Sequence, residues 1–267
     1  MDNYNQLQLR EIFHLEFLRW LGRKLKADNY SLKGGANLRL FFNSFRYSED
    51  MDLDISDVRV DVLKEVVMNI LKATTFQDIL KPFGVQKIIV PDMSKAKQTE
   101  TTQRFKIHLL TSNAEDLFTK IEFSRRGFKG KVVVGAASEF ILRQYKMVPL
   151  LVAHYDITSA TMQKILALAT RKTIQARDIF DIFVLSSQYA DFASNENRKP
   201  GHFAKSDFDK FKKAQENVFE ISYEQFRDTV LSYLSPQDQE AYKTKSSWDE
   251  VKLKAVHFID ELRKNYA

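Results

Sequence analysis

Along the first 135 residues, apolar positions follow a helical period in some segments and the two-residue period of strands in others. Residues 5–28 and 60–82 carry broad apolar stripes, which predict two helices. Strands are predicted by YSL (30–32), SEDMDLDIS (48–56), QKIIV (86–90), QTETTQRFKIHLL (98–110) and LFTKIEFS (117–124). The last two flank the turn-like sequence SNAED, so we expect them to pair as a hairpin.

From about residue 137 onward the strand pattern fades and helical periods dominate. They predict helices near 138–153, 159–171, 174–190, 206–215, 222–234, 237–243 and 247–265, with a surface loop at 194–202. We therefore expect an α+β chain. An α/β domain with a mixed sheet and flanking helices spans 1–135, and a helical domain spans 136–267.

Composition adds a preference for anionic partners. The 267 residues include 41 Lys and Arg against 35 Asp and Glu, which gives a net charge of +6 and favours a nucleotide or RNA. The absence of cysteine excludes disulfides and thiolate chemistry and fits a cytoplasmic protein. The first residues lack a secretory signal and no apolar run reaches about 18 residues, so we expect no membrane contact.

Three acidic residues alternate with apolar ones in the strand predicted around residue 52. Side chains two positions apart share one face of a strand, so Asp50, Asp52 and Asp54 point the same way. Crowded carboxylates repel each other, and a divalent cation relieves that repulsion. The alternative is an edge strand whose acidic face is simply solvated.

Two adjacent glycines stand about 15 residues upstream of the acidic strand. Gly34 and Gly35 follow a short strand and begin a predicted helix, where backbone N–H groups favour an anion such as a phosphate. Lys33, Arg39 and Arg46 add positive charge nearby. The pair alone also fits an ordinary turn, but together with the acidic strand it predicts a site for a metal-bound nucleotide.

These residues carry a family resemblance. LKGGANLRL…RYSEDMDLDI resembles the motif K-G-G-T-x-L-R followed by R-x-S-x-D-x-D in the abortive-infection nucleotidyltransferase toxins of the AbiEii/AbiGii type. QKILALATRKTIQARDIFDIFVL (163–185) is similar to a downstream segment of that family. The family belongs to the polymerase-β-like nucleotidyltransferases, so the resemblance implies that fold. Ala36 stands where family members often have threonine.

The resemblance also implies roles for individual residues. Asp50 and Asp52 would bind divalent metal, Lys164 would reach the nucleotide phosphates, and Asp178 would be a further catalytic acid. Gly34, Gly35 and Arg39 would border the phosphates, and Ser48 would bind a phosphate or start the strand.

The residues of the second segment allow a reading of their own. Lys164 and Arg171 share one helix face with Leu168, where they either meet a phosphate chain or form a solvated basic face. Of Asp178 and Asp181 on the next helix, one is expected at the site while the other pairs with Arg177 or caps the turn.

A further acid and the histidines complete the candidate chemistry. Glu122, between Ile121 and Phe123, is either a third carboxylate acting as general base or metal ligand, or a surface residue paired with Lys106 or Lys120. The five histidines form no metal-spaced pair, so we interpret them as packing or surface residues.

The predicted function is a metal-dependent nucleotidyltransferase. It would use Mg²⁺ or Mn²⁺ to move a nucleoside monophosphate from an NTP to an acceptor, with Lys33, Arg39, Lys164 and Arg171 neutralising the leaving phosphates. The resemblance implies an acceptor such as tRNA or another RNA, and a toxin restrained by a cognate antitoxin. The alternatives are a metal-dependent nuclease or phosphohydrolase, and a non-catalytic nucleotide- or RNA-binding protein on the same fold.

Overall fold

A computed structural model describes residues 4–94, 96–193 and 208–265. By its internal contacts the chain divides into two compact units. Unit 1 comprises Met1–Phe41 and Tyr47–Tyr155, and unit 2 comprises Phe42–Arg46 and Asp156–Ala267. Each unit is described by itself. Within the described residues, no helix is long and apolar enough to cross a membrane.

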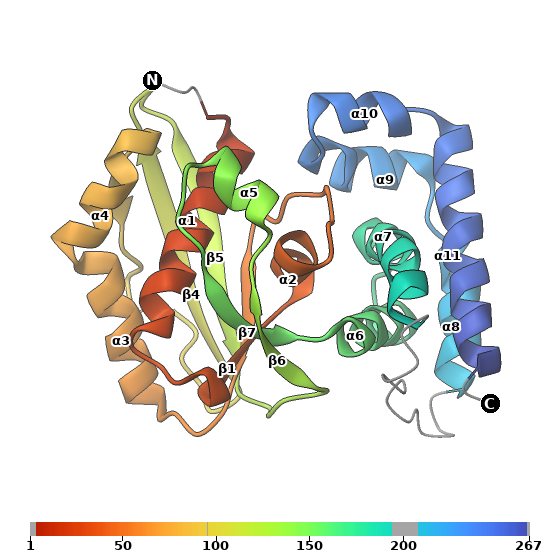
Figure 1. The fold of residues 1–267 in the computed structure, drawn as a ribbon, viewed down its shortest axis with the longest axis horizontal. Coiled ribbons are helices and arrows are strands. Elements are labelled where there is room, and N and C mark those ends of the chain that lie inside the picture. Colours follow the sequence, from red (N-terminus) through yellow and green to blue (C-terminus); the bar gives the residue numbers. More distant parts are fainter. Residues whose placement is uncertain (1–3, 95, 194–207, 266–267) are drawn as a thin grey trace. The chain divides into compact units, whose positions relative to one another are not determined.

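Unit 1 is built on a seven-stranded mixed sheet with the order β3-β4-β5-β2-β1-β7-β6 (Figure 1). Its strands are β1 (Tyr30–Lys33), β2 (Met51–Ile55), β3 (Val85–Ile89), β4 (Thr102–Thr111), β5 (Asp116–Ser124), β6 (Val132–Ala136) and β7 (Leu151–Tyr155). The β2–β5 and β1–β7 pairs are parallel, and the remaining pairs are antiparallel. The acidic strand β2 therefore lies inside the sheet, and the alternative of an edge strand is wrong.

Helices pack on the apolar face of this sheet. The helical segments of unit 1 are α1 (Gln6–Gly22), η1 (Ala27–Asn29), α2 (Gly34–Phe41), α3 (Val60–Lys72), α4 (Thr74–Leu80), η2 (Lys81–Phe83) and α5 (Glu139–Gln144). Buried apolar residues of α1, α3 and α4 form one core with Leu53 of β2, Ile121 of β5 and Phe105 of β4. The opposite face of these central strands carries the polar side chains.

Unit 2 is helical. Its described helical segments are α6 (Ile157–Thr170), α7 (Ala176–Ala193), α8 (Phe208–Val218), α9 (Tyr223–Thr229), η4 (Leu231–Tyr233), α10 (Pro236–Tyr242) and α11 (Lys245–Asn265). At its centre the fully buried Trp248 stacks on Phe226, with ring centroids 4.3 Å apart. Phe45, from the short segment Phe42–Arg46, packs edge-on against Phe180 of α7.

The predicted α+β class is confirmed, with a mixed sheet followed by helices. The predicted helix over 138–153 is wrong in its second half, because α5 ends at Gln144 and residues 151–155 form β7 beside β1. LVAHY is too short and too apolar for periodicity to separate a buried strand from a helix. The helix predicted over 60–82 is divided into α3, α4 and η2.

Two predictions about the organisation of the chain stay open. The predicted surface loop at 194–202 lies outside the described residues. The division into domains at residue 135 stays a prediction. β6 and β7 belong to the sheet, and by internal contacts the sequence divides between Tyr155 and Asp156.

Candidate active site

The acidic strand follows the alternation predicted for it. Met51, Leu53 and Ile55 are buried in the core of unit 1. Asp52 and Asp54 alternate with them along β2, while Asp50 directly precedes its first residue. The strand therefore presents its carboxylates on the face opposite the α1, α3 and α4 core.

Asp52 lies in a row of charged residues that crosses four strands. It is opposite Lys33 on β1 and beside Glu122 on β5, and Glu122 is opposite Arg104 on β4. Residues paired in this way point to the same face of a sheet. Arg104 binds Glu122 Oε2 at 2.7 Å. Glu122 thus lies next to Asp52, and its basic partner is Arg104, whereas the alternative prediction named Lys106 or Lys120.

The Asp52 carboxyl has an unfavourable environment for negative charge. Burial raises its pKa above the ordinary value, and the neighbouring charges of Glu122 and Asp50 raise it further. Lys120 and Lys33 oppose this effect without cancelling it. An ionised Asp52 therefore costs folding free energy, as expected for a group whose charge is meant to meet a cation.

Asp50 has one oxygen paired and one unpaired. Its Oδ2 accepts from Lys120 Nζ at 2.9 Å. Its Oδ1 is buried and has no hydrogen-bond partner within the described chain. Over the described residues, no group of three or more His, Cys, Asp or Glu side chains is arranged to hold a metal ion. The fit to a cation thus rests on two carboxylates, one desolvated and one with an orphaned oxygen.

Asp54 is fully engaged by protein groups. Lys33 Nζ binds its Oδ1 at 2.5 Å, and the Tyr155 hydroxyl donates to its Oδ2 at 2.5 Å. Burial together with this bond raises the pKa of Tyr155 beyond its ordinary range. Asp54 is buried, so it anchors β1 and β7 to β2.

Gly34 lies directly against the Asp52 carboxylate. Its φ of +69° belongs to the left-handed region, which glycine adopts without strain. A Cβ added at this position would lie 3.2 Å from Asp52 Oδ2. Gly35 follows it in the first turn of α2, beside the end of β1. The glycine pair and the acidic strand are therefore neighbours in space.

Arg39 and Ser48 make contacts of a different kind. Arg39 Nε binds Glu11 Oε1 of α1 at 2.7 Å, and its guanidinium lies 4.2 Å from the centre of the Tyr47 ring. The Ser48 hydroxyl donates to the carbonyl of Asp50 at 2.8 Å. Ser48 therefore holds the backbone immediately before β2, and Arg39 ties α2 to α1.

Thr119 and His14, both buried, also hold the backbone just before β2. Thr119 Oγ1 donates to the carbonyl of Glu49 at 2.7 Å and lies 2.9 Å from His14 Nε2. Because the hydroxyl proton of Thr119 is used on Glu49, His14 must donate from Nε2. Burial lowers the pKa of His14 to about 3, with the charge of Arg10 acting in the same direction, so the ring is neutral.

Unit 2 contains a second cluster, in which cations and carboxylates alternate. Lys164 Nζ of α6 lies 2.6 Å from Asp181 Oδ2 and 3.2 Å from Asp178 Oδ1, both on α7. Arg171 Nη1 binds Asp178 Oδ2 at 2.6 Å, and Arg46 binds both oxygens of Asp181 at 3.0 and 3.1 Å. The sequence of contacts is Arg46–Asp181–Lys164–Asp178–Arg171, with one cation in excess.

Burial makes this cluster differ from the predicted basic face. Lys164, Asp178, Asp181 and Arg46 are all buried, so the solvated alternative is wrong for Lys164. Burial alone opposes the charge on Asp181, but Arg46 and Lys164 outweigh it and hold the pKa of Asp181 below its ordinary range. Of the two alternatives for the second acid, neither pairing with Arg177 nor capping the turn describes Asp181, because its partners are Arg46 and Lys164.

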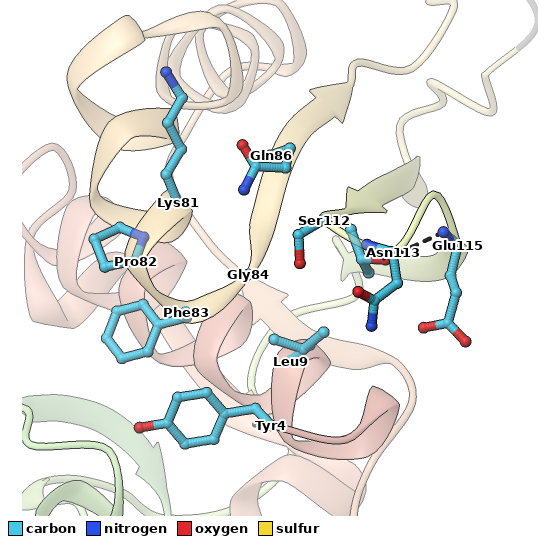
Figure 2. A pocket seen from close by; sticks show the side chains of 11 residues that line it. Tyr4, Leu9, Lys81, Pro82, Phe83, Gly84, Gln86, Ser112, Asn113 and Glu115 are labelled. Carbon is cyan, nitrogen blue, oxygen red and sulfur yellow. Dashed lines mark hydrogen bonds between the residues drawn. The ribbon is translucent and has the colours of Figure 1, made fainter. Parts of the chain in front are cut away.

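A cavity of unit 1 contains none of the predicted site residues. It has a volume of about 230 Å³ and lies among the first turn of α1, the segment Lys81–Gly84 and the β4–β5 turn (Figure 2). Tyr4 and Phe83 line one side, and Asn113 and Glu115 line the other (Figure 2). The carboxylate strand and the cluster of unit 2 therefore lie outside this cavity.

Sequence reasoning missed the partners that set the charge of these groups. Lys120 and Arg104 were visible only as members of an alternating hairpin, and Tyr155 fell in a predicted helical region. Asp181 was noted but given the wrong partner, because Arg46 precedes it by 135 positions. The parallel pairing of β2 with β5 was the missing information, since it alone places Glu122 and Lys120 beside the aspartates.

Comparisons with known proteins agree with this architecture. The family model described as "Nucleotidyl transferase AbiEii toxin, Type IV TA system" matches residues 16–250. No curated protein sequence matches the chain.

Several solved structures share the fold at low sequence identity. JHP933 from Helicobacter pylori has a TM-score of 0.57 and 18% identity, covering 98% of this chain and 94% of that one. A putative nucleotidyltransferase from H. pylori has a TM-score of 0.58 and 19% identity, covering 98% and 97%. MenT4, a nucleotidyltransferase toxin from Mycobacterium tuberculosis, has a TM-score of 0.62 and 14% identity, covering 100% and 89%.

Proposed function

Because the chain belongs to the AbiEii family of nucleotidyltransferase toxins, we propose that it transfers a nucleoside monophosphate from an NTP to an RNA acceptor such as tRNA. We further propose that this happens in the cytoplasm and that a cognate antitoxin restrains it. One observation carries the proposal. Asp52 is a desolvated carboxylate on a central strand, beside Glu122 and against Gly34, with the unpaired Asp50 Oδ1 nearby in sequence.

The two aspartates suit a hard divalent cation, Mg²⁺ or Mn²⁺. Mg²⁺ prefers one or two carboxylates and completes its shell with water and phosphate oxygens. Asp50 and Asp52 would hold it, and a bound cation would offset the burial and the neighbouring negative charges that raise the pKa of Asp52. When bound, such an ion supplies charge stabilisation to the attacking and leaving oxygens of an in-line displacement.

The chain's own residues position and neutralise the substrate in this proposal. The backbone of Gly34 and Gly35 at the start of α2 admits phosphate oxygens close to the helix N-terminus. Glu122, next to Asp52, accepts the proton of the attacking hydroxyl or completes the cation site. Lys164 and Arg171, whose cluster carries one cation in excess, neutralise the triphosphate.

For three of the predicted nucleotide ligands the contacts favour a positioning role. Arg39 acts through Glu11, Arg46 acts through Asp181, and Ser48 acts through the carbonyl of Asp50. Lys33, bound to Asp54, sets the charge beside Asp52. We propose that these residues shape the site without contacting the nucleotide.

Transfer is tested by incubating the protein with each α-labelled NTP, Mg²⁺ and total tRNA. Asp52→Asn is compared with Asp61→Asn, which makes the same substitution at an exposed position of α3. Label on RNA with wild type and Asp61→Asn, but not with Asp52→Asn, is the expected result. Shortened RNA without label would replace the proposal with a nuclease, and NTP binding without label or shortening would indicate a binding protein.

A further inference from the structure

The polar face of the β4–β5 hairpin carries cations and rings in register beside the aspartates. Alternation along β4 places Arg104, Lys106 and His108 on this face, and alternation along β5 places Phe118, Lys120 and Glu122 there. The buried residues Phe105, Ile107 and Ile121 point to the other face. This set, Arg104, Lys106, His108, Phe118 and Lys120, is called the hairpin face below.

Two lysines lie directly opposite each other at its centre. Lys106 of β4 is paired with Lys120 of β5. Like charges in opposite positions destabilise a sheet. Lys120 is bound to Asp50, whereas Lys106 is exposed and has no ion-pair partner among the described residues. An anion lying across the hairpin at this row would remove the repulsion.

The next row presents aromatic surface. His108 is paired with Phe118, and their rings meet edge to face with centroids 5.4 Å apart. The His108 side chain is 41% exposed, and Ile89, its partner on β3, is 43% exposed. Partly exposed rings beside cations are the surface on which unpaired nucleotide bases stack.

The order of these rows leads toward the candidate active site. Along β5, Phe118, Lys120 and Glu122 follow one another at steps of about 7 Å. Lys120 contacts Asp50, and Glu122 lies beside Asp52. A nucleic-acid strand that stacks a base on Phe118 and places a phosphate at Lys106 therefore reaches the carboxylates within one further row of the hairpin.

We propose that the hairpin face binds the single-stranded end of a polynucleotide acceptor and leads its terminal hydroxyl to Asp50 and Asp52. The inference rests on the proposed function, of which it specifies the acceptor site. A row of rings next to a row of cations favours a polynucleotide over an acidic protein, which would use the cations alone.

Binding is measured without NTP, by fluorescence anisotropy of an end-labelled single-stranded RNA oligonucleotide at several salt concentrations. Lys106→Gln is compared with Lys64→Gln, which removes the same charge from an exposed position on α3. We expect Lys106→Gln to weaken binding and to reduce the slope of log K against log salt by about one, because one phosphate contact is lost. Phe118→Leu is expected to weaken binding by at least about fivefold with an unchanged slope.

Equal effects of Lys106→Gln and Lys64→Gln would overturn the inference, as would a polyglutamate peptide that binds in a Lys106-dependent manner while RNA does not. The transfer assay separates this failure from that of the proposed function. If wild type transfers label but both glutamine variants have the same KM for RNA, the acceptor site is wrong and the function stands. If wild type transfers nothing but RNA binding still depends on Lys106, the function is wrong and the surface stands.

Discussion

Replacing Arg46 with methionine should destabilise unit 2 strongly while leaving nucleotide affinity nearly unchanged. The Arg46 and Asp181 side chains are 6% and 0% exposed, and the two bonds between them are 3.0 and 3.1 Å long. Removing one partner of a buried ion pair costs about 3–5 kcal/mol, because the other charge stays buried. Lys164 still contacts Asp181, so we expect about 3 kcal/mol, the lower end of that range.

A double-mutant cycle isolates the pair. Asp181→Leu removes the partner instead. The double variant Arg46→Met/Asp181→Leu removes both charges, so neither is left buried without the other. Buried pairs replaced by apolar groups often lose little stability. The double variant should therefore be more stable than the sum of the single effects predicts, by about 2 kcal/mol.

The two tryptophans make the assay specific to each unit. Trp248 is buried in unit 2, and Trp20 lies on α1 of unit 1. In a Trp20→Phe background, fluorescence during urea unfolding therefore reports unit 2 alone. Arg46→Met should lower the urea midpoint of this signal. It should also start acid unfolding at higher pH, because Arg46 helps to hold the pKa of Asp181 low, and that stabilisation is lost as pH falls below about 3.8.

Additive effects in the cycle, or a loss below about 1 kcal/mol for Arg46→Met, would refute the reasoning from burial. A large rise in the dissociation constant for NTP with unchanged stability would restore Arg46 as a direct phosphate ligand. Arg227→Met is the matched control in unit 2, because the Arg227 side chain is 53% exposed and pairs with Asp228, which is 60% exposed. It should leave the urea midpoint nearly unchanged.

Three further variants test the carboxylate strand and its support. Asp52→Asn should abolish transfer yet raise the melting temperature at pH 7. The raised pKa of Asp52 means that stability falls as its carboxyl ionises, so the gain should vanish in acid, and added Mg²⁺ should stabilise wild type but not the variant. Gly34→Ala should lose activity and about 1 kcal/mol of stability, because φ is +69° and Cβ would press on Asp52 Oδ2, as calorimetry and transfer assays would show. His14→Gln should flatten the acid side of the stability curve. The free energy of unfolding of wild type falls by about 1.4 kcal/mol per pH unit as pH falls from 6.5 toward 3. In this range the imidazole of His14 binds a proton in the unfolded chain but stays neutral in the folded one.

Local periodicity was enough to predict which face of the carboxylate strand each side chain occupies. Alternation alone placed Met51, Leu53 and Ile55 in the core and the aspartates on the other face, and the structure confirms this. It could not distinguish Asp54 from Asp52, because their difference comes from β1 and β7. Lys33 and Tyr155 satisfy Asp54, whereas Asp52 faces Glu122 and Gly34.

Long-range pairing accounts for what the sequence did not reveal. A helical wheel placed Lys164 and Arg171 on one face of a predicted helix, but Arg171 lies just after the end of α6, and burial of that face depends on which helix covers it. Asp178 and Asp181 on α7 convert an apparently solvated basic stripe into an alternating cluster that is buried except at Arg171. No window of the sequence contains Arg46 together with its partner Asp181. Contacts that span more than 100 positions leave no periodic signature.

The segment Phe42–Arg46 belongs to unit 2, and its backbone continues directly into the residues that precede β2. The chain leaves unit 1 after α2, packs Phe45 and Arg46 against residues of unit 2, and returns to unit 1 at Tyr47. Asp50 follows Arg46 by only four positions. The carbonyls of Glu49 and Asp50 are fixed by Thr119 and Ser48, so little slack remains between Arg46 and β2. Loss of the Arg46–Asp181 pair should therefore lower kcat through the placement of Asp50.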